Sequence, residues 1–205
     1  MLSRMKLGIG PVTGLAALTA AGIGLGWLVA RPDTGEPVKL DEFHGVAVFD
    51  NGPLIARSHG RHFAEDGYYF GQKWQCVEFV KRYFYLAHQH RMPDVWGHAK
   101  DFFAPGVAHG QLNPQRGLLQ FRNGGDMPPR PGDLVVFTNG IYGHVAIITA
   151  VRADEVEVIQ QNILGRPRDA HLLVSTDGRH LMGESYRPAG WLRVPAAAPG
   201  QQLSP

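Results

Sequence analysis

The spacing of apolar residues predicts one well-defined helix over residues 75–90. Its apolar positions follow an i, i+3, i+7, i+10 spacing: Val77, Val80, Phe84 and Ala87. That spacing places them on one face of a helix. The polar positions expected on the solvent-facing side are Lys81, Arg82, Gln89 and Arg91. Pro93 is expected to end the helix, because proline cannot continue its hydrogen bonding.

The pattern changes along the rest of the chain. Asp94 is expected to cap a short second helix, and residues 104–132, rich in Gly, Pro, Asn and Gln, are expected to form a long loop. Short apolar runs separated by turn residues then predict a set of strands: residues 134–137, 143–151, 156–160, 171–174 and 190–194. One N-terminal helix packed on a meandering antiparallel sheet is an α+β fold.

The first thirty residues have the pattern of a membrane-targeting element. Residues 7–30, LGIGPVTGLAALTAAGIGLGWLVA, contain no charged side chain. At about 1.5 Å per residue, a helix of this length crosses a hydrocarbon layer of about 30 Å. Arg4 and Lys6 precede it, which favours a membrane anchor with the rest of the chain outside the cytoplasm, periplasmic or extracellular. Residues 1–30 have two alternative interpretations. They could be a signal peptide that is cleaved to give a secreted protein, or a buried core helix.

Length and charge limit what the remainder can be. The chain has 205 residues, 44% of them apolar, and a formal net charge of +2. We expect one folded domain at residues 46–194, between a polar linker at 31–45 and a disordered tail at 195–205. The net charge belongs to the N-terminal segment, so the rest is neutral and no nucleic-acid partner is expected. A single cysteine excludes an intramolecular disulfide framework and a multi-cysteine zinc site.

Three residues carry the candidate chemistry: Cys76, His144 and Asn162. Cys76 lies at the predicted helix start, where free N–H groups and the helix dipole stabilise a thiolate. A nucleophilic cysteine needs a base, and His144 opens the most apolar of the predicted strands. Asn162 follows the next strand, from which its side-chain oxygen can reach and orient the imidazole. Each residue alone has an ordinary structural explanation, but their order along the chain favours a cysteine hydrolase.

These residues lie in segments that resemble a known family. Trp74-Gln75-Cys76-Val77-Glu78-Phe79, Gly143-His144-Val145-Ala146-Ile147-Ile148 and Gln161-Asn162 resemble a CHAP domain, the cysteine, histidine-dependent amidohydrolase/peptidase family. The resemblance covers most of the chain from residue 50 to 194 and is strongest to glutathionylspermidine amidase-type domains. It implies a papain-like fold related to the NlpC/P60 hydrolases.

The resemblance also implies a role for each site residue. Cys76 would be the nucleophile that forms a thioester, His144 the general base and then acid, and Asn162 the orienting third member. Gln75, with the backbone N–H of Cys76, is a candidate oxyanion donor, and no metal or organic cofactor is needed. Two positions depart from the family pattern. Gln160 stands where relatives usually have Glu, and like Gln75 it is a candidate for oxyanion or substrate binding. Lys81 replaces an Arg that would be expected to bind a substrate carboxylate.

The substrate and two other function classes stay open. Export favours an amide bond in peptidoglycan, whereas the resemblance favours a small conjugate such as glutathionylspermidine. A zinc hydrolase using His59 and His62 is a further alternative, although the chain has no H-E-x-x-H motif. So is a non-catalytic, membrane-anchored binding module on a papain-like fold, against which the presence of both Cys76 and His144 argues.

Overall fold

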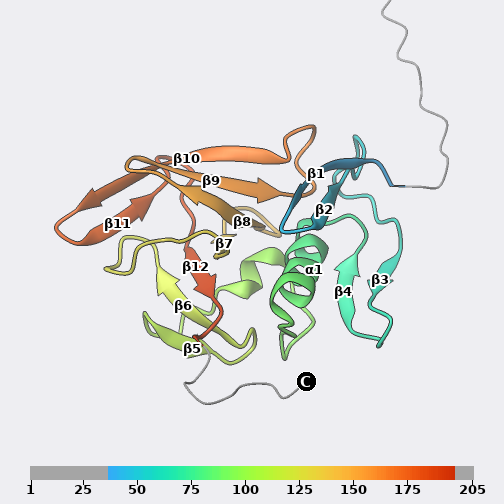
Figure 1. Ribbon diagram of the computed structural model, residues 1–205, viewed down its shortest axis with the longest axis horizontal. Helices are drawn as coiled ribbons and strands as arrows, with labels where there is room; N and C mark the ends of the chain where they lie inside the picture. Colours follow the sequence, from blue (N-terminus) through green and yellow to red (C-terminus); the bar gives the residue numbers. More distant parts are fainter. Residues whose placement is uncertain (1–36, 197–205) are drawn as a thin grey trace, which may run out of the picture. The chain divides into compact units, whose positions relative to one another are not determined.

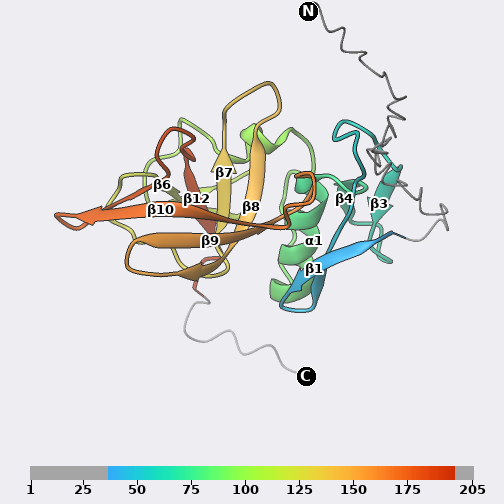
Figure 2. The same cartoon turned by 90° about the horizontal axis from the view of Figure 1, so that it is seen from above.

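The computed structural model describes residues 37–196, which are mostly β-sheet with one α-helix (Figures 1 and 2). Two short hairpins come first, and the helix follows them. In chain order these elements are β1 (Lys39–Phe43), β2 (Val46–Phe49), β3 (Arg61–Phe63), β4 (Tyr69–Gln72) and α1 (Cys76–His88). A 3₁₀-helix, η1 (Ala99–Phe102), then leads into the remaining strands. These are β5 (Gln111–Asn113), β6 (Leu118–Arg122), β7 (Leu134–Phe137), β8 (His144–Val151), β9 (Glu155–Gln160), β10 (Arg168–Thr176), β11 (Arg179–Met182) and β12 (Gly190–Arg193).

The strands after the helix form one eight-stranded antiparallel sheet in the order β11-β10-β9-β8-β7-β12-β6-β5. Its central strands β7 and β8 are buried on both faces, so they are continuous apolar runs rather than alternating ones. The sheet curls so far that Asn123, next to β6, bonds both the N–H and the carbonyl of Met182 in β11. Curling lets the sheet cover one of its own faces.

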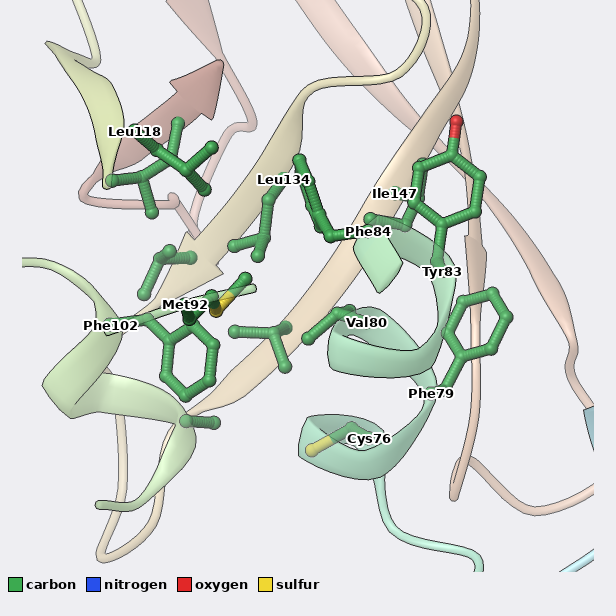
Figure 3. Packing of buried hydrophobic residues seen from close by; sticks show 14 of the residues in the cluster. Cys76, Phe79, Val80, Tyr83, Phe84, Met92, Phe102, Leu118, Leu134 and Ile147 are labelled. Carbon is green, nitrogen blue, oxygen red and sulfur yellow. The ribbon is translucent and has the colours of Figure 1, made fainter. Parts of the chain in front are cut away.

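Two apolar clusters fill the two faces of the sheet. One lies between the sheet and α1, where Figure 3 shows Val80 and Phe84 of the helix beside Leu134 and Ile147 of the sheet. The other lies inside the curl and includes Trp191, which is fully buried. Each cluster removes large apolar side chains from water, which is the main favourable contribution to folding. The catalytic candidate at the start of α1 therefore lies on a rigidly packed element.

The predicted helix is confirmed as Cys76–His88, and it ends at Gln89 in a left-handed conformation, before Pro93 is reached. The prediction that Lys81 and Arg82 face solvent is wrong, because both are buried. The cause is that α1 contacts β8 on one side and β2 and β4 on the other (Figure 1). The apolar pattern identifies the face toward the large sheet, whereas the face toward the hairpins is lined with paired polar groups.

The five predicted strands are present, with ends that differ from the prediction by at most three residues. Other predictions differ from the structure. The helix does not come first, because β1–β4 precede it, and the predicted loop at residues 104–132 contains β5 and β6. The short second helix is η1, which begins after His98 rather than at Asp94. Strands β1–β6, which the apolar pattern does not predict, have three to five residues each, too few for a period of apolar residues to show in the sequence.

Strand β1 lies within residues 31–45, the segment predicted as a linker, and pairs with β2. The segment is polar because much of this hairpin is exposed, but Phe43 stacks against Tyr83 of the helix at 5.8 Å between ring centroids. Within residues 37–196, no helix is long and apolar enough to cross a membrane. The predicted anchor at residues 7–30 and most of the predicted tail lie outside the described residues.

Candidate active site

Cys76 is the first residue of α1, and its thiol is almost completely buried. The extended backbone of Gln75 precedes it, so the free N–H groups of the first helical turn surround the sulfur. Figure 3 shows the side chain at the end of the helix, beside the apolar cluster. Burial raises the pKa of Cys76 to about 11, although the backbone N–H groups of Val145, Val77 and Cys76 itself act in the opposite direction. The thiol is therefore protonated at neutral pH.

His144 is the first residue of β8 and lies next to Val145, whose N–H faces the sulfur. Its Nε2 lies 3.0 Å from Oε1 of Gln160 in the neighbouring strand β9. An amide oxygen only accepts hydrogen bonds, so Nε2 carries the proton and Nδ1 is the nitrogen that can take one up. The side-chain N–H of Gln160 donates to the carbonyl of Arg166 at 3.2 Å, which fixes this orientation of the amide.

The pKa of His144 is lowered to about 4, first because burial disfavours the imidazolium, with the hydrogen bond that Nε2–H donates to Gln160 acting in the opposite direction. At neutral pH both His144 and Cys76 are thus uncharged in the free protein. Proton transfer from the thiol to the imidazole must then accompany the attack on a substrate, which is general-base catalysis rather than a preformed ion pair.

The hydrogen bond to His144 that was expected of Asn162 is made by Gln160. The backbone of Asn162 has φ 66°, in the left-handed region that Asn tolerates better than most residues. Its side chain points to other partners: Nδ2 donates to Ile55 O at 2.9 Å and to Gln75 Oε1 at 2.5 Å. Its Oδ1 accepts from Asn51 at 2.9 Å. The left-handed turn just after β9 directs Asn162 away from the imidazole.

Gln75 belongs to the same network and is not a free oxyanion donor. Its Nε2 donates to Ile55 O at 3.1 Å and to Arg57 O at 2.9 Å, so both of its N–H groups are used within the protein. Asn51 adds bonds to the carbonyls of the same loop. Three amide side chains thereby fix the loop at residues 54–57 beside the start of α1. The available donor at this end of the helix is backbone N–H.

These residues line one cleft of about 700 Å³. Cys76, His144, Gln160, Gln75 and Asn162 all contribute to its surface. Aromatic side chains make up much of the remaining lining: Tyr69, Trp96, Phe137, Tyr142 and Tyr186. A cleft of this size with mainly apolar walls and a few polar groups at its centre is typical of a site for a small molecule or a segment of a polymer.

Charge is scarce in the cleft. Asp169 is the one carboxylate among the described residues that line it, and its Oδ1 is paired with Arg166 Nη2 at 2.9 Å. His59 and His62, considered for zinc, bond instead to the carbonyl of Asn51 and to Glu78. Among residues 37–196 no three His, Cys, Asp or Glu side chains are grouped as a metal site would require.

A buried ionic cluster supports the helix behind the cleft. Glu78, fully buried, accepts from Arg82 at 2.6 Å and from Gln161 at 2.7 Å. Burial alone would raise the pKa of Glu78, but hydrogen bonds from His62, Arg82 and Gln161 bring it below its usual value. Gln161 also accepts from Phe49 N–H and donates to Gln75 O, which joins β2, β9 and the helix start. Sequence reasoning missed this role because nothing in the local pattern distinguishes a buried Gln.

The site combines a buried thiol at a helix N-terminus with an imidazole and its amide partner on adjacent strands. This combination is typical of the class of cysteine hydrolases. The comparison with known proteins then gives the family. Residues 67–162 match the CHAP domain family model. This confirms the resemblance inferred from the sequence.

The curated relatives support the class. The chain is 36% identical over 107 residues to the bifunctional glutathionylspermidine synthetase/amidase of Escherichia coli (strain K12), covering 50% of this chain and 17% of that protein. It is 28% identical over 118 residues to the trypanothione synthetase of Crithidia fasciculata, covering 54% and 18%. The match therefore covers less than a fifth of the length of these relatives. Together the family and the amidase relatives indicate a cysteine amidohydrolase.

Proposed function

We propose that this protein hydrolyses an amide bond through a thioester on Cys76, in a papain-like active site, with His144 as general base and then general acid. Nδ1 of His144 takes the thiol proton as the sulfur attacks the carbonyl carbon, and the amine leaves with that proton. Water then attacks the thioester, releases the acid and restores the thiol. The observation that carries this proposal is the 3.0 Å contact of His144 with Gln160 in the cleft that also contains Cys76.

Gln160 is the orienting residue in this proposal, the role first expected of Asn162. A neutral partner holds the imidazole in one tautomer but adds no charge to stabilise the imidazolium. The backbone N–H of Cys76 supplies an oxyanion donor at the positive end of the helix dipole. Asn162 and Gln75 contribute indirectly, by fixing the loop that forms one wall of the cleft.

For the substrate we propose a peptide-type amide in peptidoglycan. The cleft wall is aromatic, and its one described carboxylate is already paired with Arg166. A polyamine carries several positive charges, which a binding site would meet with free carboxylates. An uncharged peptide amide needs no such groups. The uncharged segment at residues 7–30, preceded by Arg4 and Lys6, supports a location outside the cytoplasm, where peptidoglycan is found.

Glutathionylspermidine is the second candidate, because the amidase relatives are named for it. One experiment separates the two. The full-length protein is incubated in parallel with purified peptidoglycan and with glutathionylspermidine, and new amines and acids are identified by mass spectrometry. The Cys76→Ala variant is the control. New amino groups from peptidoglycan alone support our proposal, whereas release of spermidine alone overturns the substrate assignment. Turnover of neither would favour a binding module.

A further inference from the structure

Lys81 is a buried basic residue that the proposed chemistry does not use, and burial lowers its pKa to about 7. Its side chain lies in α1 with no exposed surface, and no salt bridge reaches it within residues 37–196. Instead Nζ donates to the backbone carbonyl of Tyr69 and, at 3.1 Å, to that of Val95. The ammonium also lies 5.1 Å from the ring centroid of Tyr69. Lys81 therefore does not face the cleft as a substrate-carboxylate ligand.

A second buried basic residue holds the same segment. Arg116, which is 1% exposed, donates to Asp94 O at 2.7 Å and to Trp96 O at 3.1 Å. With the bond from Lys81 to Val95, three consecutive carbonyls are thus bonded to buried basic side chains. A loop backbone fixed at every residue in this way loses most of its conformational freedom. Burying two basic groups is costly, as the lowered pKa values of Lys81 and Arg116 show, so simple packing of a loop would be achieved at lower cost by apolar side chains.

The segment held by Lys81 and Arg116 presents Trp96 at the cleft. The indole is 63% exposed although it is a large apolar group, and it lines the same cleft as Cys76. Its ring packs at an angle of 45° against Tyr69, with 5.3 Å between the centroids. An exposed aromatic side chain on a fixed backbone has little entropy left to lose on binding, which is the property of a recognition anchor.

We propose that Trp96 is a specificity-determining residue that stacks on a flat, uncharged group of the substrate next to the scissile amide, and that Lys81 and Arg116 are positioning residues that fix it. This inference adds the substrate recognition to the proposed amide hydrolysis, and its kinetic test rests on that proposed function. Lys81 acts through the Tyr69 and Val95 carbonyls and touches neither the substrate nor the reacting atoms. A lysine is suited to this because one ammonium group can donate to two carbonyls that approach from different elements.

The kinetic test uses Trp96→Ala, Lys81→Met and the double variant, with a soluble peptidoglycan fragment as the substrate. We expect Trp96→Ala to raise KM about tenfold with kcat changed less than about twofold, because a uniform binding interaction is lost. Lys81→Met should raise KM in the same direction, and the double variant should be no worse than Trp96→Ala alone. Trp96→Phe and Lys81→Arg should restore part of the loss. Leu112→Ala, an exposed apolar residue of β5 outside the cleft lining, is the matched control.

Additive effects of Trp96→Ala and Lys81→Met, or a fall in kcat at unchanged KM, would overturn the inference. A second measurement tests the role of Trp96 independently of the proposed amide hydrolysis. Cys76 is alkylated with iodoacetamide and with a naphthyl iodoacetamide, and the two rate constants are compared. We expect Trp96→Ala and Lys81→Met to reduce the preference for the aromatic reagent, even if no amide is hydrolysed. An unchanged ratio in both folded variants refutes the role of Trp96, whatever the substrate.

Discussion

Replacing Gln160 by Glu tests the electrostatics of the proposed catalytic pair most directly. Oε1 of Gln160 lies 3.0 Å from Nε2 of His144, so Gln160→Glu places a carboxylate beside the imidazole without changing the size of the side chain. The pKa of His144, lowered to about 4 by burial, should rise, because a neighbouring negative charge favours the imidazolium. That change should convert a neutral pair into one that forms a thiolate more readily.

The size of the effect can be bounded. Two unit charges about 4 Å apart at an effective dielectric of about 20 attract by about 4 kcal/mol, which corresponds to a pKa change of about 3. Two costs oppose this gain. The new carboxylate is buried, as Gln160 is now, and it faces the carbonyl of Arg166, to which Gln160 donates at 3.2 Å. We therefore expect the pKa of His144 to rise by at least about 1 rather than the full 3.

The assay is the pH dependence of Cys76 alkylation by iodoacetamide. Gln160→Glu should raise the alkylation rate between pH 6 and 8 by about tenfold, because the thiolate is the reactive form and a more basic imidazole takes up the thiol proton more readily. Gln111→Glu, which adds the same charge on the exposed edge strand β5, should leave the profile unchanged. A folded Gln160→Glu protein with the wild-type profile would refute the assignment of Gln160 as the partner of His144.

Three further predictions follow from the site. Cys76→Ala should lower amide hydrolysis by at least about 10⁴-fold while thermal unfolding stays cooperative, and retained hydrolysis would exclude Cys76 as the nucleophile. His144 should make the protein less stable as pH falls from about 6.5 to 4, by up to about 3 kcal/mol, because the unfolded chain takes up a proton that the folded protein excludes. Urea unfolding at several pH values should show a weaker dependence in His144→Gln, and an equal dependence would contradict the part-buried neutral imidazole. Asn162→Ala should cost about 1–3 kcal/mol in urea unfolding through lost hydrogen bonds but leave the alkylation pH profile unchanged. A shifted alkylation profile would indicate that Asn162 orients the imidazole after all.

The sequence by itself determined the elements that carry the chemistry. The apolar period of residues 77–87 required a helix, and the continuous apolar run after His144 required a strand buried on both faces. Cys76 at the start of that helix and His144 at the start of that strand follow from these two patterns. Both are local properties, in which neighbouring residues in the chain determine the outcome.

Only the tertiary structure decided how the polar residues pair. Gln160 and Asn162 are two residues apart, and the backbone at Asn162 is left-handed. Gln160 therefore bonds to the imidazole of His144, whereas Asn162 bonds to the loop at residues 54–57. Lys81 has the sequence context of an exposed lysine, yet the hairpins β1–β2 and β3–β4 bury that side of the helix. These outcomes depend on hydrogen bonds between residues far apart in the chain. Such pairings leave no period in the sequence, because a buried amide or ammonium group is defined by its partners rather than by its neighbours.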